Sequence, residues 1–228
     1  MNNRLRLIIE HISGKLGVID VGTDHGYLPI ALAQSGYTGN IIASDINSAP
    51  LSKARNNAEQ AGLQNRIQFR LCDGLEGCNP AEIDTIVIAG MGGDTICGIL
   101  DRAEWCMSDK YTLILQPMTK AEILRYWLVN NGFVITSEER TKENGTIYQI
   151  IVAVFDCNST LTDAELFTGN VTLRKDEYFA EELDMLLKRF IKAADGMKNV
   201  PRKYSQWKLY DSIIRQLEEM RSEYENSQ

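Results

Sequence analysis

The first half of the chain alternates short apolar runs with segments of helical periodicity. The apolar runs have the length of buried strands, and the segments between them repeat apolar residues every three or four positions. Strands that alternate with helices of this length predict right-handed βαβ units and a parallel sheet. The expected strands are 17–22, 41–45, 67–71, 85–89 and 111–116. The expected helices are 27–35, 48–61 and about 120–131.

Two further strand-like segments follow, at 133–139 and 147–155. They are joined only by the short turn 142–145, with the sequence KENG, and so short a connection predicts an antiparallel hairpin. A parallel sheet that ends in an antiparallel hairpin is unusual for nicotinamide dehydrogenases. It is typical of class I S-adenosylmethionine methyltransferases, so the pattern favours that Rossmann-like α/β fold.

The chain changes character after residue 157. No alternation typical of strands remains, and apolar residues recur at helical spacing through 180–194 and 207–224. A turn-rich stretch separates these segments, which predicts an antiparallel α-helical hairpin of coiled-coil type. We therefore expect a methyltransferase-like domain over 1–157 and a helical hairpin domain over 158–228.

Aromatic residues recur along the predicted hairpin. At helical spacing, such residues are expected to pack between the two helices rather than to serve as platforms for bases. The residues concerned are Phe179, Phe190, Trp207 and Tyr210.

Composition and charge narrow the class of protein. The 228 residues are 44% hydrophobic and 24% charged, which is ordinary for a folded protein, and the formal net charge is −7. An acidic total argues against a uniformly basic nucleic-acid coat but leaves room for a local basic stripe. No apolar segment has the length of a signal peptide core or a membrane span, so a cytoplasmic protein is expected.

Five scattered cysteines, without a C-x-x-C pair, argue against a disulfide scaffold and against a structural metal site. Free thiols in a reducing compartment are the expected state, and no metal is expected.

A glycine motif, Asp20-Val-Gly22-Thr-Asp24-His-Gly26, ends the first strand and opens the first helix. Glycine lets the backbone approach a ligand closely, and the amides of a helix N-terminus accept its polar groups. Asp24 stands where the dinucleotide fingerprint has its middle glycine, and a carboxylate there would repel a pyrophosphate. A cationic ligand such as S-adenosylmethionine fits better than NAD. The alternative is a strained glycine turn without a ligand.

Two more acidic positions follow strands. Asp45 ends the second strand about twenty residues after the glycine motif, where a carboxylate can accept hydrogen bonds from a ribose diol. The alternative is that Asp45 caps the next helix. Asp73 and Gly74 follow the third strand and suit a contact with an adenine amino group, with space for the ring. All lie at carboxyl ends of strands, where open α/β sheets bind ligands.

The fourth and fifth strands are followed by candidate rim elements. The run 89–93, AGMGG, suggests close backbone approach to a flat ring or to a methionine portion. It lacks the [DN]-P-P-[YF] motif of amino-group methyltransferases that act on adenine. The segment 116–118, QPM, gives a second rigid rim, although a plain strand-to-helix turn explains it equally well.

Four segments together closely resemble one family. They are DVGTDHGYLPIAL, ASDINSAPLSKARNNAEQAGL, DTIVIAGMGGDTI and LILQPMTKAEILRYWLVNNGF, in this order, and the resemblance runs from the N-terminus through Val154. The family is that of the bacterial tRNA (adenine(22)-N1)-methyltransferases (TrmK-type). The helical tail also looks like the coiled-coil C-terminal domain of that family, although its sequence is less diagnostic.

The resemblance implies methyl transfer from S-adenosylmethionine to N1 of an adenine in tRNA, in the D-arm. By matching positions it implies a cofactor site made of Asp20, Gly22, Thr23, Gly26, Asp45, Ile46, Asp73, Gly74 and Gly90. It also implies that Asp24, His25 and Tyr27 border the target base and serve as the catalytic residues.

Each of the last two has an alternative structural role. His25 could cap backbone amides in the turn, and Tyr27 could belong to the core on the first helix. A stacking role for Tyr27 would fit an enzyme that must expose the N1 edge of a flipped base.

Positive charge is concentrated in the predicted hairpin. Between Lys188 and Lys208 stand seven Lys or Arg residues and one acid, Asp195. A solvated surface is the ordinary explanation of such a run, but on a tRNA-modifying enzyme it becomes a candidate phosphate-binding patch. The predicted RNA-binding residues are Lys188, Arg189, Lys192, Arg202 and Lys203.

Two alternatives to this function stay open on the sequence. One is a methyltransferase with another RNA or a small molecule as substrate. The other is a non-enzymatic Rossmann-like binding module that uses its helical hairpin for protein partners. The oligomeric state does not follow from the sequence, and a monomer is compatible with it.

Overall fold

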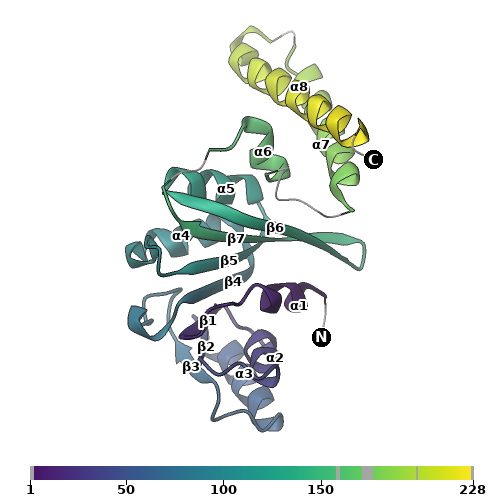
Figure 1. The fold of residues 1–228 in the computed structure, drawn as a ribbon. Coiled ribbons are helices and arrows are strands. Elements are labelled where there is room, and N and C mark those ends of the chain that lie inside the picture. The colour runs from purple at the N-terminus through teal and green to yellow at the C-terminus, as the bar shows by residue number, and fades with distance from the viewer. Residues whose placement is uncertain (1–2, 158–159, 171–176, 199, 227–228) are drawn as a thin grey trace. The chain divides into compact units, whose positions relative to one another are not determined.

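Seven strands form one mixed sheet in a computed structural model of the chain (Figure 1). The structure describes residues 3–157, 160–170, 177–198 and 200–226. The strand order is β3-β2-β1-β4-β5-β7-β6. The bounds are β1 Gly17–Val21, β2 Asn40–Asp45, β3 Gln68–Leu71, β4 Thr85–Gly92, β5 Thr112–Thr119, β6 Phe133–Glu143 and β7 Thr146–Phe155.

The direction of the strands confirms the predicted fold class. Strands β1 to β5 pair in parallel, whereas β7 lies antiparallel between β5 and β6. The turn from β6 to β7 is the dipeptide Asn144-Gly145, with φ of 50° and 81°. Positive φ at both positions suits the two-residue hairpin turn that matches the twist of the strands. The parallel sheet therefore ends in an antiparallel hairpin, with a turn tighter than the four residues predicted.

Helices cover both faces of this sheet (Figure 1). Helices α1, α2 and α3 share one core cluster on one face. Helices α4 and α5 pack against each other, α4 on β4 and β5 and α5 on β5 and β6. The bounds are α1 Asn3–Glu10, α2 Tyr27–Gln34, α3 Ser48–Gln60, α4 Gly93–Asp101 and α5 Ala121–Asn130, with short 3₁₀ turns at Pro80–Glu82 and Glu104–Cys106. The sequence pattern predicted α2, α3 and α5 and assigned no element to α1 or α4.

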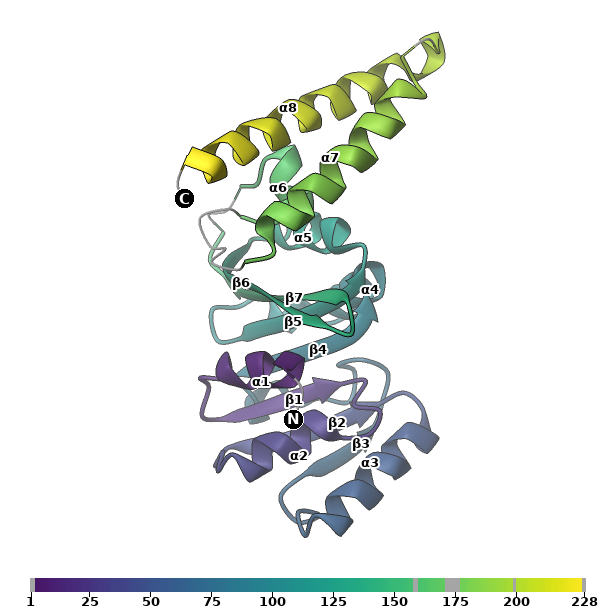
Figure 2. The same ribbon diagram turned by 90° about the vertical axis from the view of Figure 1, so that its right-hand side faces the viewer.

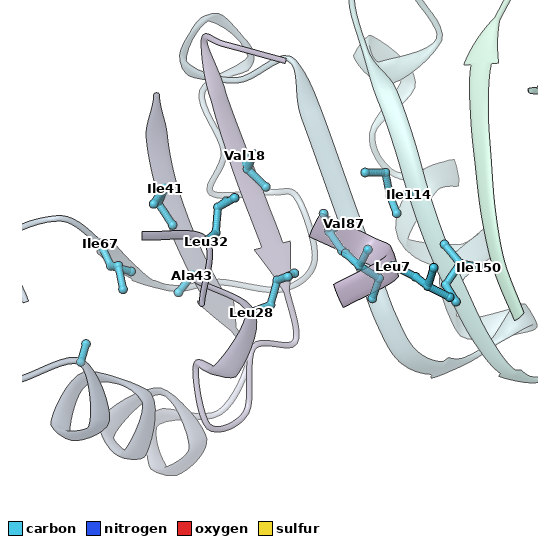
Figure 3. Packing of buried hydrophobic residues seen from close by; sticks show 12 residues of the cluster. Leu7, Val18, Leu28, Leu32, Ile41, Ala43, Ile67, Val87, Ile114 and Ile150 are labelled. Carbon is cyan, nitrogen blue, oxygen red and sulfur yellow. The ribbon is translucent and has the colours of Figure 1, made fainter. Parts of the chain in front are cut away.

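The core under the first three helices joins distant segments of the chain (Figure 3). Leu7 of α1, Leu28 of α2 and Ala58 of α3 belong to one buried cluster with Val18 of β1 and Val87 of β4. Burial of each leucine or valine of this cluster stabilises the fold by roughly 1.5–3 kcal/mol. The packing of α1 matters for function, because it brings the N-terminal residues to the carboxyl ends of the strands.

The chain divides into two compact units, Met1–Ser159 and Thr160–Gln228. The second unit contains α6 Asp163–Thr168, α7 Phe179–Asp195, the 3₁₀ turn Pro201–Lys203 and α8 Tyr204–Asn226. Within this unit α7 and α8 run antiparallel as the predicted hairpin (Figure 2).

The aromatic residues of the hairpin divide into two groups. Phe179 and Phe190 are buried in its core, and Tyr210 packs against that core with its ring edge-on to Phe190 at 5.2 Å. The packing prediction is confirmed for these three. It is wrong for Trp207, which stands outside the core cluster and is stacked on Tyr204 instead.

All five cysteines carry free thiols. Burial raises the pKa of the Cys97 and Cys106 thiols to about 11, so neither is a good nucleophile at neutral pH. Among the described residues, no helix combines the length and the hydrophobicity that crossing a bilayer requires.

Candidate active site

Two adjoining pockets open at the carboxyl ends of the parallel strands. The first, which we call the β2 pocket, has a volume of about 480 Å³ and is lined mainly by the ends of β1, β2 and β4. The second, the α1 pocket, has a volume of about 350 Å³ and lies between α1 and the loop after β1. Gly22, Ala89 and Gly90 line both pockets. The site can therefore hold two chemical groups that meet beside these three shared residues.

Gly22 stands at the point where the two pockets meet. Its φ is +75°, a conformation that glycine adopts without steric cost. A Cβ atom here would lie 2.2 Å from Cε of Met91. The N–H groups of Gly22 and Thr23 donate to the carbonyl of Ser44, at 2.8 and 2.9 Å, which holds the loop against β2. The glycine motif thus forms a close turn whose outer surface is bare backbone.

Gly26 ends this loop and caps α2. It has a φ of +71°, and a Cβ atom would lie 3.0 Å from Cβ of Ala54 on α3. Gly26 lines neither pocket. Its contribution is to set the close approach of α2 to α3.

Asp20 lies at the floor of the α1 pocket, on β1. Burial raises the pKa of its carboxyl to about 6, and the charge of Asp45 adds to the rise. The cause is desolvation, because a buried carboxylate loses the water that would stabilise its charge. A cation entering the α1 pocket would supply that missing stabilisation.

Asp24 and His25 stand at the mouth of the α1 pocket. Asp24 has a φ of +40°, which is uncommon for a residue other than glycine and marks strain of the kind found at functional sites. Its side chain is 64% exposed, and Oδ2 lies 3.5 Å from Nε2 of His25. No backbone amide of the described residues donates to the His25 ring, so the capping alternative for His25 is wrong.

Tyr27 extends the same surface. Its ring is 60% exposed and is stacked on the His25 ring, with centroids 5.3 Å apart and planes at 18°. The alternative that placed Tyr27 in the core is therefore wrong. Two parallel aromatic rings face solvent beside an exposed carboxylate, an arrangement suited to a planar cationic or amino-bearing group.

The β2 pocket is lined by Asp45 and Ile46. Asp45 is buried, and its Oδ1 accepts a hydrogen bond of 2.8 Å from the backbone of Asn47. Asn47 is the N-cap residue of α3, so the alternative that Asp45 caps this helix is wrong. The remaining carboxylate oxygen of Asp45 is available to a ligand, and Ile46 is an exposed apolar residue beside it.

The far end of the β2 pocket contains Asp73 and Gly74. Gly74 has a φ of +56°, and a Cβ atom would lie 2.9 Å from Cγ2 of Ile99. Oδ1 of Asp73 accepts from Arg102 at 2.9 Å, and Arg102 also contacts Glu76 at 3.2 Å. The sequence analysis missed Arg102, because nothing in its spacing relates it to the third strand.

The backbone at Gly90, which lines both pockets, is supported by a buried amide. Gln116 of β5 is fully buried, and its Oε1 accepts hydrogen bonds from the backbone of Gly90 and from Nη1 of Arg4, each of 3.2 Å. Its Nε2 donates to the carbonyl of Pro117 at 3.1 Å. Gln116 lies in the strand, so the strand-to-helix-turn explanation of 116–118 is wrong. The sequence analysis did not predict that Arg4 lies at the site. The cation in a short amphipathic segment before the first strand could have indicated it.

Comparison with known proteins shows which family the chain belongs to. A family model described as a methyltransferase domain matches residues 1–151. The chain belongs to the methyltransferase-domain family. Within that broad family, the predicted resemblance to the tRNA (adenine(22)-N1)-methyltransferases is confirmed.

One curated relative and two solved structures carry that resemblance. The tRNA (adenine(22)-N(1))-methyltransferase of Bacillus subtilis is 35% identical over 153 residues, which are 67% of this chain and 64% of that protein. The matched part thus spans less than two thirds of the B. subtilis protein. The crystal structure of the B. subtilis m1A22 tRNA methyltransferase TrmK has a TM-score of 0.85 at 27% identity and covers 97% of this chain and 98% of that one. The M. capricolum TrmK in complex with S-adenosyl-homocysteine has a TM-score of 0.81 at 26% identity, covering 97% and 98%.

The methyltransferase domain brings most predicted site residues together. The predicted cofactor and catalytic residues all line one or both pockets, with the exception of Gly26. Those in the α1 pocket are Asp20, Gly22, Thr23, Asp24, His25, Tyr27 and Gly90. Those in the β2 pocket are Gly22, Asp45, Ile46, Asp73, Gly74 and Gly90.

The five predicted RNA-binding residues lie in the second unit, on α7 and in the turn before α8. Within the described part of the chain all five are exposed, and none forms an ion pair. The guanidinium of Arg189 lies 5.9 and 5.7 Å from the ring centroids of Phe167 and Phe190. Lys188 lines a shallow pocket that also contains Asp184, Glu218 and Glu225, so acids lie near its charge even though it forms no ion pair.

Proposed function

We propose that this chain transfers a methyl group from S-adenosylmethionine to N1 of an adenine in tRNA, at position 22 in the D-arm. The observation that carries the proposal is the pair of adjoining pockets, one suited to a nucleoside and the other bounded by carboxylates and stacked rings. Two similar solved structures support the choice, since both are TrmK proteins and one of them holds S-adenosyl-homocysteine.

The residues of the site fit this cofactor. In the β2 pocket we assign Asp45 to the ribose diol and Asp73 with Gly74 to the adenine, and the bare backbone at Gly74 leaves space that a Cβ would reduce. In the α1 pocket we assign Asp20 to the ammonium group, because a buried carboxyl with a raised pKa gains most from a cationic partner. When bound, the cofactor supplies an electrophilic methyl group on a positively charged sulfur.

The bare backbone of Gly22 and Gly90 borders both pockets, and the loop residues Thr23 and Gly26 hold it in position. Alignment of the methyl group with N1 where the two pockets meet is what we expect the fold to contribute to the rate, because fixed geometry removes most of the entropic cost of bringing two reactants together. Ile46 would cover the apolar face of the adenosine.

Asp24, His25 and Tyr27 would contact the target base. N1 of adenine has a lone pair and no proton, so no general base is needed, but the product carries a positive charge. We assign Asp24 to stabilising that charge or to accepting a hydrogen bond from the N6 amino group. The stacked rings of His25 and Tyr27 would support an adenine turned out of its helix.

The helical unit would bind tRNA through its cations. Lys188, Arg189, Lys192, Arg202 and Lys203 are exposed and positively charged, as phosphate contacts require. A tRNA substrate and the free thiols support a cytoplasmic location.

Methyl incorporation tests the proposal. Purified chain, labelled S-adenosylmethionine and tRNA that lacks the modification should give labelled tRNA, and the Asp45→Ala variant should lose affinity for the cofactor. Calorimetry that detects no binding of S-adenosylmethionine would instead favour a binding module without enzymatic activity. Methyl transfer to another RNA, or to a small molecule only, would contradict the assignment of the substrate.

A further inference from the structure

The first turns of α8 carry two aromatic side chains outside the core of the helical unit. Tyr204 is 55% exposed and Trp207 is half-buried. Their rings are stacked, with centroids 5.9 Å apart and planes at 18°, whereas the core rings of Phe190 and Tyr210 meet edge-on at 86°. Because the two rings are stacked on each other, each can offer only its outer face to a further ring, and the pair differs in kind from the interlocked rings of the core.

Helix geometry shows that Tyr204 is not directed at the core. Ile213 and Leu217 are the buried residues of α8. Tyr204 precedes Ile213 by nine positions, which places the two residues about 180° apart around the helix axis. The ring of Tyr204 therefore points away from α7 and contributes little to the packing of the hairpin.

Cations surround this aromatic pair. Nζ of Lys208 lies 4.9 Å from the ring centroid of Tyr204, and Arg202 and Lys203 immediately precede it. Along α8 the next acid, Asp211, is already paired with Arg215. An exposed stacking surface among uncompensated cations is the combination that binds single-stranded nucleic acid, with bases on the rings and phosphates on the cations.

We propose that Tyr204 and Trp207 form a stacking site for an unpaired nucleobase of the tRNA, while Arg202, Lys203 and Lys208 contact the adjacent phosphates. This inference rests on the proposed function and adds a second RNA contact, separate from the pocket that receives the target adenine. The base must be unpaired, because a base inside a duplex is already stacked on both faces. The partner is therefore a loop or a bulge of the RNA, not a continuous helix.

Substitution of the two rings tests the site in the full chain. Trp207→Ala and Tyr204→Ala should each raise the dissociation constant and the KM for tRNA by roughly 10- to 100-fold, the range of base–aromatic stacking. The kcat and the affinity for S-adenosylmethionine should stay at the wild-type values. Trp207→Phe, which keeps a ring, should retain most of the affinity. Leu209→Ala removes a side chain that is 45% exposed on the same helix and should have no effect.

The salt dependence separates stacking from charge. Trp207→Ala removes no charge, so the slope of log K against log salt should be unchanged. Lys203→Ala should reduce that slope by about 0.7–0.9, the change expected for one lost phosphate contact.

The outcomes distinguish this inference from the proposed function. Alanine variants that methylate tRNA with wild-type KM and dissociation constant overturn the stacking site and leave the function intact. Variants that change the oligomeric state in sedimentation also overturn it, because the rings would then be a contact between two copies of the chain. Trp207-dependent binding of tRNA without methyl transfer supports the site and overturns the function. A wild-type chain that binds no tRNA overturns both.

Discussion

The buried carboxyl of Asp20 gives the site a pH dependence whose size follows from its pKa. That pKa is raised from 3.8 to about 6 by burial. At pH 5 only about a tenth of the Asp20 side chains are ionised in the unbound protein, and at pH 7 about nine tenths are. A ligand cation that requires the ionised form should therefore bind about ten times more weakly at pH 5 than at pH 7.

The same shift lowers the stability of the unbound protein. Asp20 has a higher pKa in the folded protein than in the unfolded chain, so the folded state binds more protons. The free energy of unfolding therefore falls as the pH rises from 3.8 to about 6. The difference corresponds to about 3 kcal/mol at pH 7. Asp20→Asn removes the charge and keeps the shape. It should stabilise the unbound chain at pH 7 by up to about 3 kcal/mol and change its stability little below pH 4.

Calorimetric titration with S-adenosylmethionine between pH 5 and pH 7 checks the affinity, and urea unfolding at pH 4 and pH 7 checks the stability. The matched control is Asp24→Asn, which alters an exposed carboxylate and should keep the tenfold change in affinity. Asp20→Asn should bind weakly and equally at both pH values. An unchanged wild-type affinity between pH 5 and pH 7, or a pH dependence that survives in Asp20→Asn, would refute the reasoning.

Four further predictions concern catalysis and stability. Asp24→Asn should lower kcat by roughly 10²-fold, the usual loss for a group that stabilises transition-state charge, while cofactor affinity stays constant; equal loss of both would make Asp24 a cofactor ligand. Gln116→Leu leaves the Gly90 N–H and Arg4 without their acceptor and should cost about 1–3 kcal/mol in unfolding free energy, whereas Gln116→Glu keeps the acceptor but loses the donor to Pro117 and should recover only part of it. Arg125 and Glu138 form a fully buried ion pair of 2.7 Å, so Glu138→Leu should cost about 3–5 kcal/mol by denaturant titration, and adding Arg125→Met should restore part of that loss. Because N1 attack needs neither base nor Lewis acid, enzyme dialysed against EDTA and then assayed on tRNA folded in Mg²⁺ should keep its initial rate of methyl transfer, and a rate restored only by adding a transition metal would contradict this.

The sheet and most cofactor positions could be predicted from local sequence. Asp45 and Asp73 follow strands whose apolar runs are distinct, and the topology of a parallel sheet brings strand ends together without any knowledge of packing. The glycine at position 22 could be singled out from the motif, and the structure gives the reason for it, a φ of +75° that side chains rarely adopt.

Other features depend on contacts between distant segments. Arg4 and Gln116 are 112 positions apart, so no spacing rule relates them. Helix α4 begins in the glycine run Gly92-Gly93, where composition indicates a loop and tertiary packing against β4 and β5 decides in favour of a helix.

The position of Trp207 in the helical unit also could not be predicted from local sequence. Its spacing is that of a core residue, yet the buried face of α8 is set further along the helix by Ile213 and Leu217. The pattern alone could not show where the hairpin core ends. Tyr204 and Trp207 are stacked on each other beyond the end of this core, where we propose that they bind a nucleobase.

The most direct test of the central claim is the position of the methyl group on tRNA. Two transcripts of one tRNA that differ only at position 22, adenine or guanine, would be incubated with the chain and S-adenosylmethionine, then digested and mapped by mass spectrometry. We predict 1-methyladenosine at position 22 of the first transcript and no methylation of the second. Equal methylation of both transcripts, or a methyl group on any atom other than N1 of adenine, would contradict the account.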